Sequence, residues 1–245
     1  MKNHVKTALL LSTFSAVAVL TGCQSEAMPQ PKSAPEAAET VIAPRCEFDS
    51  PEVMKKEWRI SGAFGTLRKT KFTIVDEPTA GDKKVLAVVA KKSSGFLVLR
   101  IKGQDLNKYP RMRWRWRVIR NLNLPVSKDK DPDDQPCVIY VSTRIDGNDK
   151  SVAYRWECNT EAGLAQKIEY PLSKTVYAYC LRNRGTAVGE WVEEERNVLE
   201  DFKAAFGMVP SDFVIIIGGN SQHSSSNTRA EIDYIEFLPA AKSDK

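Results

Sequence analysis

The sequence predicts a mostly β domain, a jelly-roll-like β-sandwich with one short helix near residues 199–206. Two observations predict this fold: many short β-rich runs, and turn-forming clusters such as Ala80-Gly81-Asp82 between them. Many short strands separated by turns favour a sandwich or jelly roll over an α/β fold. The predicted strands are Lys71–Val75, Lys84–Ala90, Phe96–Lys102, Met112–Ile119, Val138–Arg144, Val152–Glu157, Thr175–Leu181, Glu190–Val198, Phe213–Ile217 and Ala230–Phe237.

Residues 1–22 have the organisation of a lipoprotein signal peptide. Two lysines form a basic start, and residues 8–20 form an apolar run that is too short for a permanent membrane-spanning helix of about 20 residues. The run ends in Leu20-Thr21-Gly22-Cys23, which resembles a bacterial lipobox, so we expect Cys23 to be the lipidated mature N-terminus. Three acyl chains would hold the protein in the lipid bilayer, because one chain alone binds only marginally. Gln24 after the cysteine favours the outer membrane, with the protein facing the periplasm.

Residues 23–45 are rich in Pro, Ala and Glu and contain almost no large apolar side chains, which predicts a flexible tether. Residues 46–239 are enough for one domain with a sizeable core, and we expect residues 240–245 to be a disordered tail. The formal charge of +5 includes the two signal-peptide lysines. A balance this mild in an exported protein excludes nucleic acid as the expected partner.

The predicted helix follows Asn197. Asn197 can cap the helix with its side chain, Phe202 and Phe206 give it an apolar stripe, and Gly207 closes it.

Four segments together resemble a known family: "YPRMRWRWRV" (109–118), "DPDDQPCVIYV" (131–141), "YRW" (154–156) and "GEWVEEERNVLEDFKAAFG" (189–207). The family consists of exported bacterial proteins and is known only as domain of unknown function 3047. The resemblance implies a jelly-roll-like sandwich and implies no activity. In the segment most like the family, we expect four side chains to have a structural role: Trp191, Arg196, Asp201 and Phe206. Of these, Phe206 is expected to be buried.

Four cysteines follow the tether: Cys46, Cys137, Cys158 and Cys180. An exported protein meets an oxidising compartment, so we expect two disulfides. A four-residue turn at 146–149 would place Cys137 opposite Cys158, and Cys46 would then pair with Cys180; a bridge between Cys158 and Cys180 is a near alternative. Metal binding by these cysteines is less favoured, because no CxxC spacing occurs.

The stretch "RMRWRWR" (111–117) puts arginines and large apolar groups on opposite faces of a strand. Trp114 and Trp116 are predicted to lie in the core, so Arg113 and Arg115 would point outward. The same alternation in the 138–144 and 152–157 runs turns Tyr154 and Trp156 inward, with Tyr140 and Arg155 facing each other outside. We therefore expect one ligand-binding face that contains Arg113, Arg115, Tyr140 and Arg155.

An alternative is that the arginines are neutralised within the protein. Glu193, Glu195 and the acidic stretch Asp131, Asp133 and Asp134 could supply the carboxylates. The acidic stretch resembles a calcium loop only in part, because Asp134 and Tyr140 replace the Gly and Glu of an EF-hand. A single structural calcium is the one cofactor this stretch could hold.

No catalytic residue is selected by the sequence. After removal of the signal peptide the only histidine is His223, in a polar loop, and nothing in the spacing selects a carboxylate pair among Glu190, Glu193 and Asp134 for glycoside hydrolysis.

We therefore expect an outer-membrane lipoprotein with a carbohydrate-module-like sandwich that binds a ligand such as an anionic envelope glycan, by analogy of fold. One alternative is a non-enzymatic lipoprotein that docks on an envelope protein. A polysaccharide-cleaving enzyme is the less favoured alternative.

Overall fold

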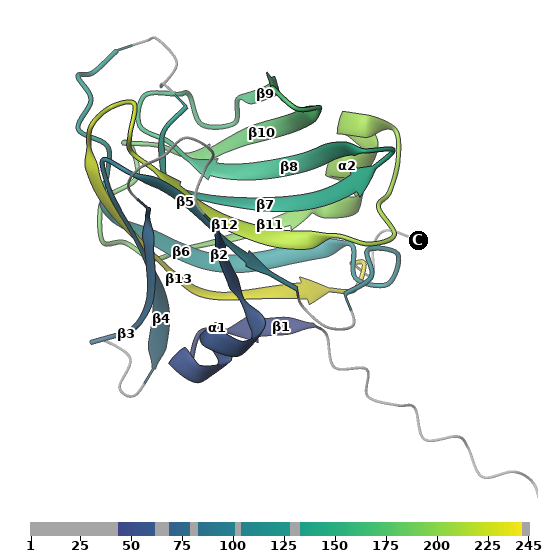
Figure 1. Cartoon of the computed structure of the whole chain (residues 1–245), viewed down its shortest axis with the longest axis horizontal. Coiled ribbons are helices and arrows are strands. Elements are labelled where there is room, and N and C mark those ends of the chain that lie inside the picture. The colour runs from purple at the N-terminus through teal and green to yellow at the C-terminus, as the bar shows by residue number, and fades with distance from the viewer. Residues whose placement is uncertain (1–43, 62–68, 79–82, 101–103, 128–132, 242–245) are drawn as a thin grey trace, which may run out of the picture. The chain divides into compact units, whose positions relative to one another are not determined.

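Two β-sheets packed face to face make up the domain in the computed structural model, which describes residues 44–61, 69–78, 83–100, 104–127 and 133–241 (Figure 1). The six-stranded sheet has the order β11 (Val192–Asn197), β6 (Arg111–Arg120), β13 (Asn227–Leu238), β4 (Lys84–Lys91) and β3 (Lys71–Asp76), with β1 (Arg45–Glu47) also paired to β13. The seven-stranded sheet has the order β2 (Arg59–Ser61), β5 (Ser94–Leu99), β12 (Val214–Asn220), β7 (Gln135–Ile145), β8 (Asn148–Trp156), β10 (Lys174–Arg182) and β9 (Ala165–Tyr170).

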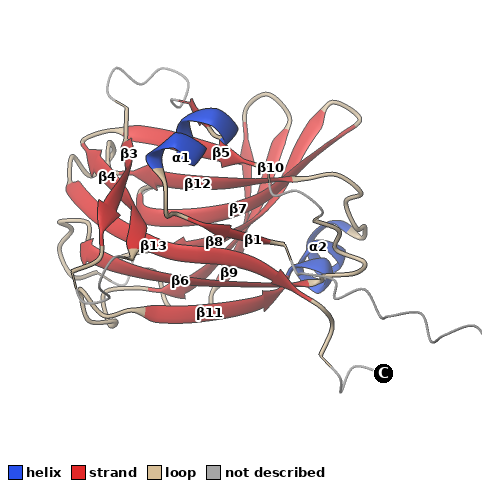
Figure 2. Ribbon diagram, turned by 90° about the horizontal axis from the view of Figure 1, so that it is seen from below, coloured by secondary structure: helices blue, strands red, loops and turns tan. Residues whose placement is uncertain are grey.

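This architecture confirms the predicted mostly β, jelly-roll-like sandwich, and Figure 2 shows how few residues belong to helices. Each of the ten predicted strands is found, with shifted ends. The sequence did not predict three short strands, β1, β2 and β9, or the helix α1 (Pro51–Glu57), which begins after the N-cap Ser50. No helix among the described residues is long and apolar enough to cross a membrane. The predicted signal peptide, most of the tether, Cys23 and Asp131 lie outside the described residues.

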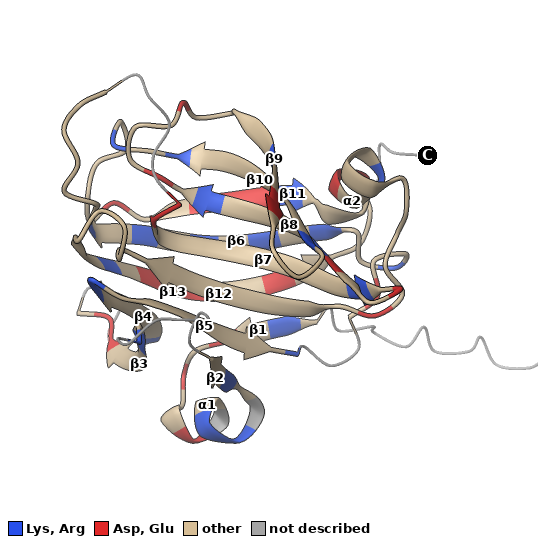
Figure 3. Cartoon of the chain, turned by 45° about the horizontal axis from the view of Figure 1, so that its top comes forward, with Lys and Arg blue, Asp and Glu red and all other residues tan. Residues whose placement is uncertain are grey.

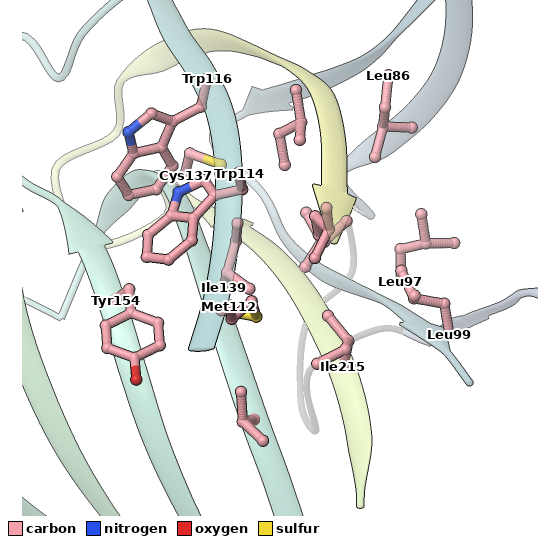
Figure 4. Packing of buried hydrophobic residues seen from close by; sticks show 14 of the residues in the cluster. Leu86, Leu97, Leu99, Met112, Trp114, Trp116, Cys137, Ile139, Tyr154 and Ile215 are labelled. Carbon is pink, nitrogen blue, oxygen red and sulfur yellow. The ribbon is translucent and has the colours of Figure 1, made fainter. Parts of the chain in front are cut away.

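The core is held by aromatic rings that meet between the two sheets. Trp114 and Trp116 of β6 are fully buried, as predicted, and Figure 4 shows them beside Tyr154 and Cys137 of the other sheet. The ring of Trp114 lies 5.1 Å from that of Tyr154, and the ring of Trp116 lies 5.5 Å from that of Trp156. Edge-to-face and tilted contacts at these distances add stabilisation beyond the burial of apolar area.

The hairpin between β7 and β8 corrects the predicted register. Asp146 and Gly147 have φ angles of +50° and +78°, so a two-residue turn replaces the expected four-residue turn. Cys137 therefore lies opposite Trp156, and the predicted Cys137–Cys158 bridge is wrong. The structure shows no disulfide among the described cysteines. Burial raises the pKa of the Cys137 thiol well above its ordinary value, which disfavours the reactive thiolate.

The predicted helix is confirmed as α2 (Val198–Phe206). The Asn197 side chain accepts a hydrogen bond from the Glu200 N–H at 3.2 Å, and Gly207 ends the helix in the left-handed conformation. Asp201 joins the helix to two strands. It accepts a hydrogen bond from Tyr154 Oη of β8 at 2.7 Å, and it forms an ion pair with Arg196 of β11 at 2.6 Å.

The prediction that Phe206 is buried is wrong. Phe202 is fully buried in the core, whereas Phe206 is only partly buried against Tyr177 at the end of the helix. Both residues lie on the apolar stripe, but Phe202 belongs to the buried core, whereas Phe206 packs against its border and stays partly exposed.

We expect Phe202→Ala to lower the free energy of unfolding by about 3–5 kcal/mol, the usual range for a buried phenylalanine. Phe206→Ala, the matched control, should cost clearly less because its ring is only partly buried. Urea denaturation monitored by tryptophan fluorescence measures both. Equal losses for the two variants would show that α2 is seated differently.

Candidate functional site

The arginine stripe of β6 lies on the outer face of the six-stranded sheet, where it is matched by carboxylates on both neighbouring strands (Figure 3). Arg113 contacts Glu195 at 3.0 Å, and Arg115 contacts Asp233 at 3.2 Å. The hydrogen bond to Glu195 raises the pKa of Arg113. Of the carboxylates proposed in the sequence alternative that the structure describes, Glu193 and Glu195 meet this stripe, at Arg113.

Arg117 is the most enclosed member of the stripe. Its Nη2 lies 2.5 Å from Glu231 and 2.6 Å from Glu77, and both carboxylate side chains are only 3% exposed. The Trp191 ring covers the outside, 4.3 Å from the Arg117 guanidinium and 5.0 Å from that of Arg115. The stripe is therefore an ion-pair lattice that is closed by a cation–π lid.

The predicted ligand face is not formed, because its residues belong to different sheets. Arg113 and Arg115 are on β6 of the six-stranded sheet, whereas Tyr140 and Arg155 are on β7 and β8 of the seven-stranded sheet. Since the inner faces of the two sheets meet in the core, their outer faces point in opposite directions. Tyr140 and Arg155 do lie outward of the tryptophan core, as the alternation predicted, but both side chains are buried. Arg155 lies opposite Val138 instead of the expected Tyr140.

We expect Arg117→Leu to destabilise the domain by about 3–5 kcal/mol, because Glu77 and Glu231 lose the guanidinium that contacts both. Arg113→Leu, whose side chain is 35% exposed, should cost about 1 kcal/mol or less. Thermal melts of the two variants test this. A melt of Arg117→Leu equal to that of wild type would contradict the lattice.

The outer face of the seven-stranded sheet carries an apolar layer of its own and is hollowed beside it. One hollow of about 150 Å³ adjoins a larger one of about 470 Å³, and both are lined by Ser142, Lys174 and Ile216. We call the continuous depression the aromatic groove. The smaller hollow is also lined by Ser61, Phe96, Val98 and Tyr140, and the larger one also by Arg100, Arg144, Asp149, Ser151 and the 208–213 loop.

The outer face of this sheet is concave. Three strands separate β5 from β10, so a flat sheet would hold them about 19 Å apart. Yet Nζ of Lys174 on β10 lies 5.7 Å from the centroid of the Phe96 ring on β5, which the two side chains could not reach across a flat sheet. Gly218 makes room for this approach, because a Cβ there would lie 3.1 Å from the Phe96 ring and 2.9 Å from Val138.

Lys174 is the central charged group of the aromatic groove. Its ammonium lies 5.4–5.7 Å from the ring centroids of Phe96, Tyr140 and Tyr170. Within the described part of the chain it makes no hydrogen bond or ion pair; Asp149, its neighbour across the strands, is paired with Arg144. Burial lowers the pKa of Lys174, and Asp149 and Asp133 oppose the shift. A half-buried cation with no carboxylate partner in a cleft is characteristic of a binding site.

A second polar group borders the same rings. Tyr170 donates a hydrogen bond to Asp133 Oδ2 at 2.8 Å, and the buried Arg155 guanidinium contacts Asp133 at 3.1 Å and Glu157 at 3.5 Å. Asp133 itself is 42% exposed on its side chain. Arg155 thus supports, from beneath, a carboxylate that solvent can reach.

The two described aspartates of the predicted acidic calcium loop, Asp133 and Asp134, make contacts with different parts of the protein. Asp134 is fully buried and accepts hydrogen bonds from the backbone N–H groups of His223 and Ser224, at 3.2 and 2.6 Å. Asp133 points to Arg155 and Tyr170 instead. No group of three or more potential metal ligands occurs among the described residues.

Sequence reasoning missed Lys174, Phe96 and Tyr170 as site residues. The one local signal was the alternation of Gln166, Ile168 and Tyr170 in β9, a strand the sequence did not predict. Lys174 stands one residue before a predicted strand, where nothing distinguishes it from a surface lysine.

With this geometry in place, the comparisons identify the family. Residues 56–236 match the family described as "Protein of unknown function (DUF3047)", and the chain belongs to it. No curated protein matches the sequence.

Among solved structures, several resemble the chain at very low identity. The family 11 carbohydrate-binding module of the cellulosomal cellulase Lic26A-Cel5E of Clostridium thermocellum is 11% identical, with a TM-score of 0.40 over 77% of this chain and 91% of that one. The CBM22-1 xylan-binding domain from Paenibacillus barcinonensis Xyn10C is 11% identical, with a TM-score of 0.38 over 80% and 94%. The carbohydrate esterase vb_24B_21 from the Shiga toxin-encoding bacteriophage phi24B is 13% identical, with a TM-score of 0.43 over 80% and 97%. Similarity this distant carries no argument about a ligand.

Proposed function

We propose that the protein is a lipid-anchored, glycan-binding β-sandwich whose binding site is the aromatic groove. The observation that carries this proposal is the Lys174 ammonium, which lies among three aromatic rings with no carboxylate partner in the described part of the chain. A concave cleft with apolar walls and a few convergent polar groups is the usual form of a small-molecule or sugar site.

The chemistry of the groove suits an acidic glycan. Aromatic rings offer flat apolar surface to a sugar ring, while hydroxyls such as that of Ser142 offer hydrogen bonds. Arg100 and Arg144 lie at the larger hollow, each weakly paired and mostly exposed, and together with Lys174 they exceed Asp149 and Asp212 in charge. The groove is therefore mildly cationic.

Binding fits the groove better than catalysis. A general base needs a pKa near the working pH, yet burial raises the pKa of Tyr140 and of Tyr170 above their ordinary values. Asp133 and Glu157, two carboxylates that act electrostatically on Tyr140, are both ion-paired with Arg155.

Affinity measurements against acidic envelope and plant polysaccharides test the site. We expect Phe96→Ala to weaken binding by roughly threefold to tenfold, since contacts with an aromatic ring are commonly worth about 0.5–1.5 kcal/mol and 1.4 kcal/mol is tenfold. Trp191→Ala removes an aromatic ring from the opposite outer face, so it should bind as wild type does. An equal effect of both variants, or a loss seen only with Trp191→Ala, would place the site elsewhere.

The proposed membrane anchor is Cys23, with residues 24–45 as the tether and the outer membrane as the location. We expect Cys23→Ala to leave the protein unprocessed or to release it from membranes, because the three acyl chains supply the attachment. Membrane fractionation with metabolic labelling by palmitate reports this. A Cys23→Ala protein that is still processed and still found with the outer membrane would refute the anchor.

A further inference from the structure

Two groups of opposite charge contact Tyr170 beside the groove: the Lys174 ammonium lies 5.4 Å from its ring, and Asp133 accepts a hydrogen bond from its hydroxyl. We infer that the ligand is a polymer containing a hexuronate, a sugar acid whose carboxylate binds Lys174 while a hydroxyl of the same chain binds Asp133. This inference rests on the proposed glycan function and adds the chemical identity of the recognised residue.

Lys174 fits a group with one negative charge. Its single ammonium is half buried and unpaired within the described residues, so an incoming carboxylate would replace lost hydration with a charge-assisted hydrogen bond. Asp133 and Asp149 both lie close enough to act on it electrostatically. The ammonium balances the whole charge of a monoanion but only part of the charge of a dianionic phosphate, which these carboxylates repel more strongly.

Asp133 fits a hydroxyl donor. Its Oδ1 forms an ion pair with Arg155 at 3.1 Å and accepts a hydrogen bond from Gln135 Nε2 at 3.0 Å. Its Oδ2 accepts a hydrogen bond from the Tyr170 hydroxyl at 2.8 Å. A carboxylate has about four acceptor positions, so one position remains on a side chain that solvent reaches. A negatively charged acceptor cannot bind the carboxylate of the sugar, which fixes the orientation of the ligand across Tyr170.

Arg155 and Tyr170 are positioning residues for Asp133. Arg155 is almost fully buried, so its guanidinium holds Asp133 in one place without reaching the ligand. Asn220 adds a third restraint by donating a hydrogen bond to the Asp133 main-chain oxygen at 2.5 Å. A carboxylate fixed in this way loses little conformational freedom on binding.

Isothermal titration of the intact domain compares polygalacturonate with the same polymer after its carboxylates are reduced to alcohols. Wild type should bind the acid form at least tenfold more tightly than the reduced form. Lys174→Met should bind the two forms with similar affinity, because the charge that distinguishes them is gone. Lys71→Met, an exposed lysine on edge strand β3, is the matched control and should keep the preference.

Variants at Asp133 test the other half of the site. Asp133→Asn should weaken both forms of the polymer severalfold, since it removes the charged acceptor. Tyr170→Phe keeps the ring and removes the hydroxyl that orients Asp133, so it should show a smaller loss of the same kind. The second variant keeps the test decisive if Asp133→Asn does not fold.

The outcomes separate this inference from the proposed function. Equal wild-type affinity for the acid and reduced forms, or tighter binding of dextran sulfate than of polygalacturonate, would overturn the hexuronate and leave a glycan site. Unchanged affinity in both Asp133→Asn and Tyr170→Phe would overturn the role of Asp133. Absence of binding to polygalacturonate, its reduced form, dextran and dextran sulfate would contradict the proposed function itself.

Discussion

The contacts of Trp114 and Trp116 with Tyr154 and Trp156 are the constraint on which the rest of the structure depends. These rings meet at 5.1 and 5.5 Å between β6 and β8, in the centre of the sandwich. Because side chains alternate along a strand, burying these rings forces the residues between them to the two outer faces. A shift by one residue would bury the guanidiniums of β6, at a cost of several kcal/mol for each unpaired charge.

The charged side chains on the two outer faces are paired to different extents. On the six-stranded sheet, β11 and β13 bring Glu195, Asp233 and Glu231 to the arginines, so the charges are satisfied within the protein. On the concave face, Arg155 is ion-paired with Asp133 and Glu157, whereas the Lys174 ammonium lies among aromatic rings. The face that looked like a site in the sequence is therefore an ion-paired surface, and the proposed site lies on the opposite outer face.

Local alternation and capping residues were enough to predict ten of the strands, the buried indoles and the capped helix α2, because each depends on neighbouring residues. It could not predict that Arg113 and Arg155 lie on opposite faces, since periodicity defines a face within one strand and says nothing of which sheet the strand joins. The groove could not be predicted from the sequence for a similar reason. Lys174, Phe96 and Tyr140 come from distant segments and meet only through the curl of the sheet and the absence of a side chain at Gly218.

The central claim is that ligand binds the concave face and leaves the arginine lattice untouched. Titration of the ¹⁵N-labelled domain with trigalacturonate, followed by amide chemical shifts, tests it most directly. The largest shifts are expected on residues around Phe96, Ser142 and Lys174, with β6 and β11 unchanged. Shifts concentrated on β6, β11 and β13, with the concave face unchanged, would contradict it.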